Sequence, residues 1–252
     1  MTPVLRRAST GAAAASAAAA LLQRKPPGGR PRWQRTNYRG SEVSLLAGPA
    51  LAGALALGNP ALAVAALGAG AVGAYDDAVG GRDQAKGVLG HLRAVRDGRL
   101  TGGAVKVVGV SAAGAAAAGL LRPRTVADVL LGGAVIAGTA NLLNLLDLRP
   151  GRALKVGVLA GCALGAPGIA GSCAALLPAD LAERTMLGDA GANALGAAVG
   201  VALVSRLHSR PARAAALLGL GALTAASERV SFSAAIDASP ALRWFDQLGR
   251  RG

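Results

Sequence analysis

The chain has 252 residues, of which 52% are hydrophobic and only 16% are charged, and its formal net charge is +14. Its long runs of alanine, leucine, valine and glycine exceed what one soluble core of this length needs, which excludes an ordinary soluble domain. The basic residues are divided among short segments between apolar stretches, which excludes a nucleic-acid-binding domain with one basic face. We therefore expect an integral membrane protein.

The apolar stretches predict an all-α, polytopic bundle of transmembrane helices. Several stretches are shorter than the roughly 20 residues that a bilayer core requires, so tilted helices or a locally thinned bilayer are needed. Small residues at four-residue spacing, such as Gly196 and Gly200, predict close helix packing. In chain order, the stretches lie at about 3–22, 43–58, 61–75, 104–121, 126–146, 153–178, 190–205 and 212–227.

The stretch at 153–178 is either one span or two. Two short helices, hinged near residues 166–168, give nine spans within a range of eight to ten, and we choose this alternative because it places most Lys and Arg residues in cytoplasmic segments. The N-terminus is then outside, and residues 1–227 form the transmembrane domain with a cytoplasmic amphipathic tail at 228–252. A cleaved signal peptide at 3–22 is the alternative for the first stretch, and it would invert the topology.

Acidic side chains occur at the ends of the predicted helices, on the side expected to face the cytoplasm. Asp76 and Asp77 end the third stretch, Asp147 ends the fifth, and Asp189 precedes the stretch at 190–205. A hard cation such as Mg²⁺ binds a few carboxylates and keeps its other positions for water and phosphate. Taken singly, each acid could instead begin a solvated loop or cap a helix. Together they predict a Mg²⁺ site at one membrane face.

Asparagines accompany these acids. Asn141, Asn144 and Asp147 recur at a spacing of three residues, which places them on one helical face, and Asn193 lies one turn after Asp189. Asparagine inside a membrane helix often bonds a neighbouring helix. We nevertheless expect the face with Asn141 and Asn144 to point toward the acidic cluster.

Three motifs in this order resemble the polyprenyl-phosphate N-acetylhexosamine-1-phosphate transferase superfamily, which includes phospho-N-acetylmuramoyl-pentapeptide transferase (glycosyltransferase family 4). The motifs are Asp-Asp at 76–77, Asn-x-x-Asn-x-x-Asp at 141–147 and Met-Leu-Gly-Asp-x-Gly-x-Asn at 186–193. The resemblance covers most of the chain. It implies an enzyme of the cell membrane that uses Mg²⁺ to move a sugar-1-phosphate from a UDP-sugar onto undecaprenyl phosphate, with release of UMP, in cell-wall glycan assembly.

The resemblance also implies a role for each motif residue, and it leaves a homodimer as an open option. Catalytic roles fall to Asp76, Asp77 and Asp147, metal binding to Asp77 and Asp189, and substrate binding to Lys86, Asn141, Asn144 and Asn193. These roles fit phosphoryl transfer, because joining two polyanions requires charge neutralisation and in-line positioning.

Two departures from the family pattern keep an alternative open. The segment 147–151 reads Asp-Leu-Arg-Pro-Gly where the family has Asp-Gly-x-Asp-Gly, and the histidine-rich loop is missing, since the only histidines are His91 and His208. The alternative is a catalytically silent relative that binds lipid-linked precursors or scaffolds other membrane proteins. A transporter is less favoured, because its acids should lie deep within the spans.

Overall fold

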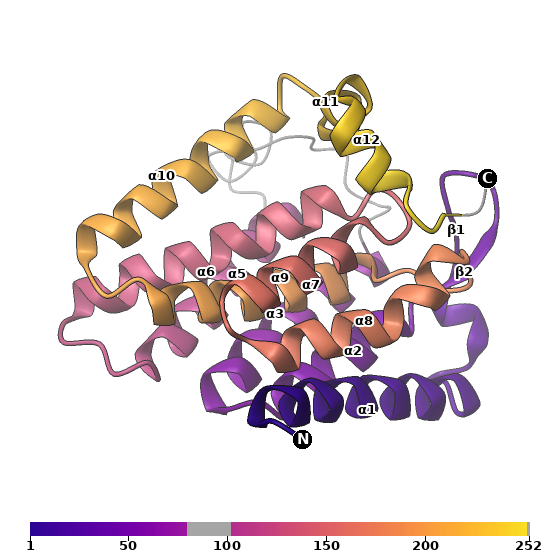
Figure 1. Ribbon diagram of the computed structural model, residues 1–252, viewed down its shortest axis with the longest axis horizontal. Helices are drawn as coiled ribbons and strands as arrows, with labels where there is room; N and C mark the ends of the chain where they lie inside the picture. The colour runs from indigo at the N-terminus through magenta and orange to yellow at the C-terminus, as the bar shows by residue number, and fades with distance from the viewer. Residues whose placement is uncertain (80–101, 251–252) are drawn as a thin grey trace.

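The computed structural model describes residues 1–79 and 102–250, whose regular secondary structure is almost entirely helical (Figure 1). The all-α fold class is therefore confirmed. Two short strands pair in an antiparallel hairpin after the first helix, with Gln34 opposite Ser44. The elements are α1 (Pro3–Arg24), η1 (Arg30–Trp33), β1 (Gln34–Thr36), β2 (Glu42–Ser44), α2 (Ala47–Ala56), α3 (Pro60–Val79), α5 (Gly102–Gly119), α6 (Val126–Leu146), α7 (Arg152–Ala163), α8 (Pro167–Leu181), α9 (Gly188–Arg206), α10 (Arg210–Ser227), α11 (Phe232–Ala238) and α12 (Pro240–Gln247).

Helix α9 lies at the centre of the bundle and packs against α2, α3, α6 and α7 (Figure 1). Residues 190–201 of this helix are buried without a break. A Cβ atom on Gly196 would lie 2.5 Å from the Cα of Ala140, and one on Gly200 would lie 2.7 Å from the Cα of Ile136. Both contacts are with the α6 backbone, so the predicted close packing at these two glycines is confirmed.

Three of the described helices, α5, α6 and α9, are long and apolar enough to cross a membrane. This finding supports a membrane protein, but it does not support nine spans. Helices α2, α7 and α8 have 10, 12 and 15 residues. At 1.5 Å per residue they extend about 15, 18 and 22 Å, against a hydrocarbon core of about 30 Å. An apolar stretch can therefore form a helix without forming a complete span.

The predicted break within 153–178 is confirmed. Helix α7 ends at Ala163, and Pro167 begins α8. Gly165, between them, has a φ angle of +62°, a conformation that glycine adopts at little cost. Proline is favoured in the first turn of a helix, where its missing N–H leaves no bond unmade. These two residues thus give the chain its turn between α7 and α8.

The C-terminal segment folds back onto the start of α7. The buried Arg152 guanidinium donates two hydrogen bonds to the Asp246 carboxylate of α12, from Nε at 2.8 Å and from Nη2 at 3.0 Å. The Lys155 ammonium donates to the backbone carbonyls of Phe245 and Asp246 at 2.9 and 2.8 Å. The segment predicted to be an amphipathic tail therefore contains two short helices, α11 and α12, and buried charges fix α12 to the bundle.

Candidate functional site

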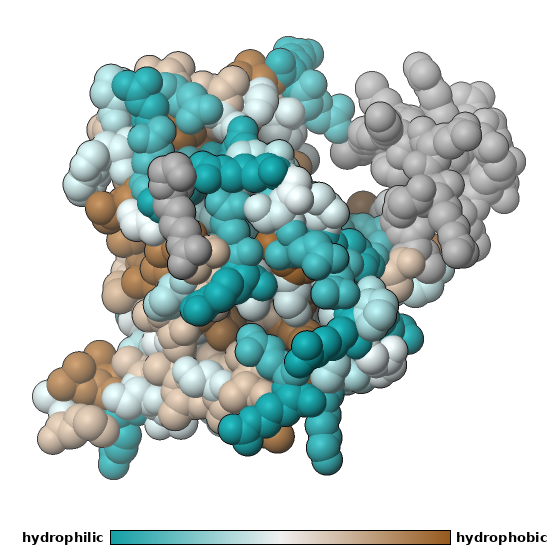
Figure 2. All heavy atoms as spheres, turned by 90° about the vertical axis from the view of Figure 1, so that its right-hand side faces the viewer, coloured by the Kyte–Doolittle hydropathy of each residue, from teal (hydrophilic) through white to brown (hydrophobic). Residues whose placement is uncertain are grey.

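The candidate site lies at the end of the bundle where α3 finishes and α9 begins. Figure 2 views the molecule from this end, and hydrophilic residues gather over its centre. Asp76 and Asp77 come from the last turn of α3, and Asp189 comes from the first turn of α9. Although Asp77 and Asp189 are 112 positions apart, the Asp77 side chain contacts the Asp189 backbone directly. The expected gathering of these three acids is thus present.

Asp77 caps the N-terminus of α9. Its Oδ1 accepts a hydrogen bond from the Asp189 backbone N–H and its Oδ2 accepts one from the Ala190 backbone N–H, both at 3.0 Å. The first N–H groups of a helix have no partner within the helix, and a carboxylate there also meets the positive end of the helix dipole. Both Asp77 oxygens are therefore engaged in positioning Asp189.

Two glycines permit this close contact between α3 and α9. A Cβ atom on Gly73 would collide with the Asp189 backbone carbonyl. Gly188 has a φ angle of +60°, and a Cβ atom there would lie 3.0 Å from Asp77 Oδ2. The glycine in the Leu-Gly-Asp segment is thus required by the backbone conformation and by the cap together.

A lysine lies between the other two carboxylates. The Lys106 ammonium of α5 contacts Asp76 Oδ2 at 3.0 Å and also pairs with Asp189 Oδ2. The side chains of Asp76 and Lys106 are each 21% exposed and that of Asp189 is 29% exposed, so solvent and solutes can reach them. None of the sequence motifs includes Lys106. The signal was available, because Lys106 is the one charged residue of the 18-residue helix α5, and a charge in an apolar helix usually has a function.

The predicted asparagine face is only partly directed to this site. Asn144 donates from Nδ2 to Asp189 Oδ1 at 3.2 Å. Asn141 instead donates to Thr224 Oγ1 of α10 at 3.0 Å. Asn193 is 1% exposed inside the bundle, and its Nδ2 has no hydrogen-bond partner in the described part of the chain. The structure therefore brings Asn144 to the acids and directs Asn141 and Asn193 elsewhere, while Lys86 lies outside the described residues.

Asp147 follows the last residue of α6 and lies near the other acids. Burial, together with the negative charges of Asp180, Asp189 and Asp77, raises the pKa of Asp147 well above its ordinary value, and a backbone hydrogen bond from Gly188 opposes this only in part. A carboxyl group in such surroundings favours its protonated form. A cation or a basic ligand that entered the site would favour ionisation of Asp147.

The β1–β2 hairpin covers the same end of the bundle. Arg35 donates from Nη2 to the Asp77 backbone carbonyl at 2.7 Å, and the Met186 N–H donates to the Ser44 carbonyl at 3.0 Å. The Tyr38 ring lies 4.1 Å from the Arg149 guanidinium carbon. Between the hairpin and the segment that begins at Asp147 is a cavity of about 60 Å³. The hairpin therefore fixes the ends of α3 and α9 relative to each other.

Two carboxylates and one amide group are the side chains of this site that could bind a metal ion. The carboxylates of Asp76 and Asp189 converge on one cationic atom, the Lys106 Nζ, and Asn144 adds an amide group beside them. Mg²⁺ is often held by one or two carboxylates plus substrate phosphates, and two carboxylates fit that pattern. Among the described residues, however, no group of three or more Asp, Glu, His or Cys side chains is arranged to hold a metal.

Comparison of the chain with protein-family models, with curated proteins and with solved structures finds no match in any of the three.

Proposed function

We propose that this protein is a Mg²⁺-dependent phosphoglycosyl transferase that moves a sugar-1-phosphate from a UDP-sugar to a polyprenyl phosphate such as undecaprenyl phosphate, with release of UMP, in cell-envelope glycan assembly. The observation that carries the proposal is the Lys106 ammonium held between Asp76 and Asp189, at the helix ends where Asn144 and Asp147 also lie. The motif resemblance in the sequence supports the same reaction.

The residues of the site supply what such a transfer needs. Mg²⁺, when bound by Asp76 and Asp189, would neutralise charge on the reacting phosphates. The Lys106 ammonium has three N–H donors and would turn from the carboxylates to a phosphate oxygen. Asp77 holds the start of α9 in place, so that the positive end of this helix faces the same space. In this proposal Asp77 is a positioning residue.

The proposed topology has nine membrane-inserted helices, with the N-terminus outside and the carboxylate site at the cytoplasmic face of the cell membrane. The excess of Lys and Arg in the segments assigned to the cytoplasm supports it. The hydrophilic surface at this end of the bundle (Figure 2) agrees with a site that meets water. For the short helices α2, α7 and α8 to cross, the bilayer must be locally thinned or the flanking polar residues must extend the span.

The test is an activity assay on the purified full-length protein with undecaprenyl phosphate, Mg²⁺ and a panel of UDP-sugars, in which UMP is measured. We expect UMP with at least one sugar, and a loss of at least about a hundredfold in Asp76→Asn and Asp189→Asn. Asp237→Asn, the same exchange at an exposed position of α11, is the matched control and should keep full activity. Activity that survives both site variants would overturn the proposed site.

One observation favours the second candidate, a silent relative that binds lipid-linked precursors. The Lys106 ammonium already pairs with both carboxylates that would hold the metal, and so occupies the position of a cation. In that case no UDP-sugar yields UMP, and the protein still binds undecaprenyl phosphate. The lipid-binding measurement, made alongside the activity assay, therefore separates the two candidates.

A further inference from the structure

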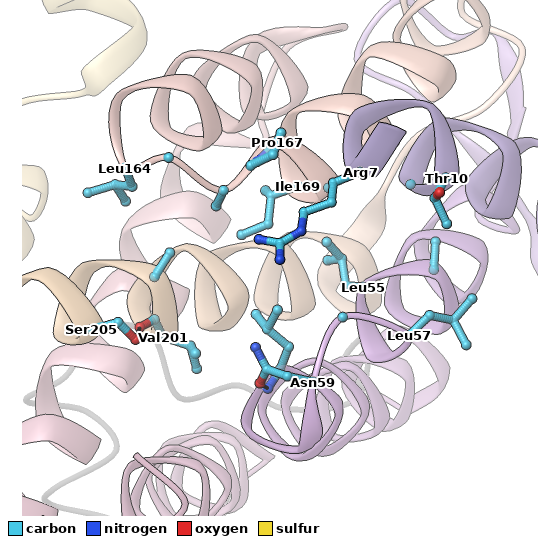
Figure 3. Close-up of a pocket in the computed structure, with 18 of the residues that line it drawn as sticks. Arg7, Thr10, Leu55, Leu57, Asn59, Leu164, Pro167, Ile169, Val201 and Ser205 are labelled. Carbon is cyan, nitrogen blue, oxygen red and sulfur yellow. Dashed lines mark hydrogen bonds between the residues drawn. The ribbon is translucent and has the colours of Figure 1, made fainter. Parts of the chain in front are cut away.

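We propose that the opposite end of the bundle holds an anionic phospholipid, with its phosphate between Arg7 and Arg206 and its acyl chains against an apolar wall. A cavity of about 620 Å³ opens at that end, between α1, the α2–α3 turn, the α7–α8 turn and the end of α9 (Figure 3). This volume is within the usual range for a small-molecule site. The inference is independent of the proposed transferase activity.

The composition of the cavity wall matches an amphiphile. Apolar side chains from four elements line it, namely Leu55, Leu62, Ile169 and Val201. Arg7 and Arg206 also line it, and no acidic side chain of the described residues does. The apolar wall favours acyl chains over a free ion, and the two positive charges favour an anionic headgroup over a zwitterionic one.

The Arg206 guanidinium is held in place by the α7–α8 turn. Its Nε donates to the Leu164 carbonyl at 3.0 Å. A Cβ atom on Gly165 would collide with Arg206 Nη2, so the glycine leaves the space that the guanidinium occupies. No other hydrogen bond of this guanidinium is present within the described residues. Its Nη groups therefore remain as donors for a phosphate.

Arg7 enters the cavity from the other side. In Figure 3 its side chain extends from α1 into the middle of the cavity, between Ile169 of α8 and Asn59 of the α2–α3 turn. Within residues 1–79 and 102–250, the Arg7 guanidinium has no hydrogen-bond or ion-pair partner. Two arginines from opposite walls thus face one space, which suits a phosphodiester, whose negative charge is shared by two oxygens that can each accept hydrogen bonds.

The position of the cavity across the membrane also suits a lipid headgroup. Asp189 lies at the start of α9 and Arg206 at its end. Arg206 is 17 positions after Asp189, which corresponds to a rise of about 26 Å along the helix, close to the thickness of a hydrocarbon core. If the carboxylate site lies at one membrane surface, Arg206 lies near the other. Lipid phosphates are abundant at that level.

The test places the full-length protein in nanodiscs with equal amounts of phosphatidylglycerol and phosphatidylcholine, and counts retained lipids by native mass spectrometry. We expect the wild type to retain phosphatidylglycerol about tenfold or more in preference. Arg7→Ala/Arg206→Ala should abolish this preference, and Arg7→Lys/Arg206→Lys, which keeps both charges, should retain it. Both arginines are exposed, so these variants should fold.

Arg6→Ala is the matched control, because Arg6 is exposed on the same helix and does not line the cavity. It should leave the lipid preference unchanged. Equal retention of the two lipids by the wild type, or an equal loss in Arg6→Ala, would overturn the proposal. So would binding of inorganic phosphate to delipidated protein as tightly as phosphatidylglycerol, since that result would indicate a site for free anions.

Discussion

Replacing Asp77 distinguishes a positioning residue from a metal ligand. Its two oxygens accept hydrogen bonds from the Asp189 and Ala190 backbone N–H groups at 3.0 Å, so Asp77→Ala leaves two N–H groups at the start of α9 without an acceptor. From the usual strength of an N-cap and of hydrogen bonds to a charged group, we expect a loss of about 2–4 kcal/mol in the free energy of unfolding. Asp77→Asn keeps one acceptor oxygen and should lose about 1–2 kcal/mol.

Two measurements on the same variants test this reasoning. Unfolding in mixed micelles with increasing SDS, followed by circular dichroism, gives the loss of stability, for which Asp237→Asn is the control at an exposed position. Titration with Mn²⁺ as a paramagnetic probe gives the metal affinity. We expect Asp77→Asn to keep the affinity within about threefold and Asp189→Asn to lower it by tenfold or more. Unchanged stability with lost metal binding in Asp77→Asn would refute the capping role.

Three further predictions follow from other contacts. Lys106→Met leaves its two carboxylate partners facing each other, so the metal-free protein should lose about 1–3 kcal/mol in stability and regain it with Mg²⁺; no regain would show that a cation cannot replace the ammonium. Burial would raise the pKa of Asp246, but hydrogen bonds and charges from two arginines outweigh it and lower the pKa. The stability that this carboxylate contributes is therefore present above its ordinary pKa of 3.8 and lost as the pH falls through the lowered value. In a variant with Trp33→Phe, the fluorescence of Trp244 should report release of α12 in that acid range. The same measurement on Asp246→Asn should show no such transition. Gly196→Ala places a Cβ 2.5 Å from the α6 backbone and should lower the thermal midpoint, whereas Gly219→Ala meets nothing within 4 Å and should raise it slightly.

The position and type of most elements follow from local sequence. Apolar runs bounded by glycine and proline predict the helices, and Pro167 predicts the break between α7 and α8. The acids at helix ends are also visible in the sequence, because a carboxylate between an apolar run and a polar loop is local information. Hydropathy alone does not give the number of spans, since it measures the polarity of a stretch and not the length of the helix that forms; among the described helices, three are both long and apolar enough to cross a membrane.

The partners of the site residues depend on helix rotation and packing. Asn141 and Asn144 are three residues apart, which turns their side chains about 60° from each other. This difference is enough to direct one to Thr224 of α10 and the other to Asp189 of α9. A pattern of residues on one face cannot distinguish two neighbouring helices that both contact that face.

The sequence by itself determined that this protein is helical and rich in membrane-compatible segments, and that its acids lie at helix ends, because periodicity, turn residues and hydropathy act over a few residues. Only the tertiary structure decided that Asp77 caps α9 and that Lys106 joins Asp76 to Asp189. It also decided that Arg7 and Arg206 share a cavity at the other end. The physical reason is that these contacts join distant segments, and their geometry is fixed by glycines that let particular helices approach.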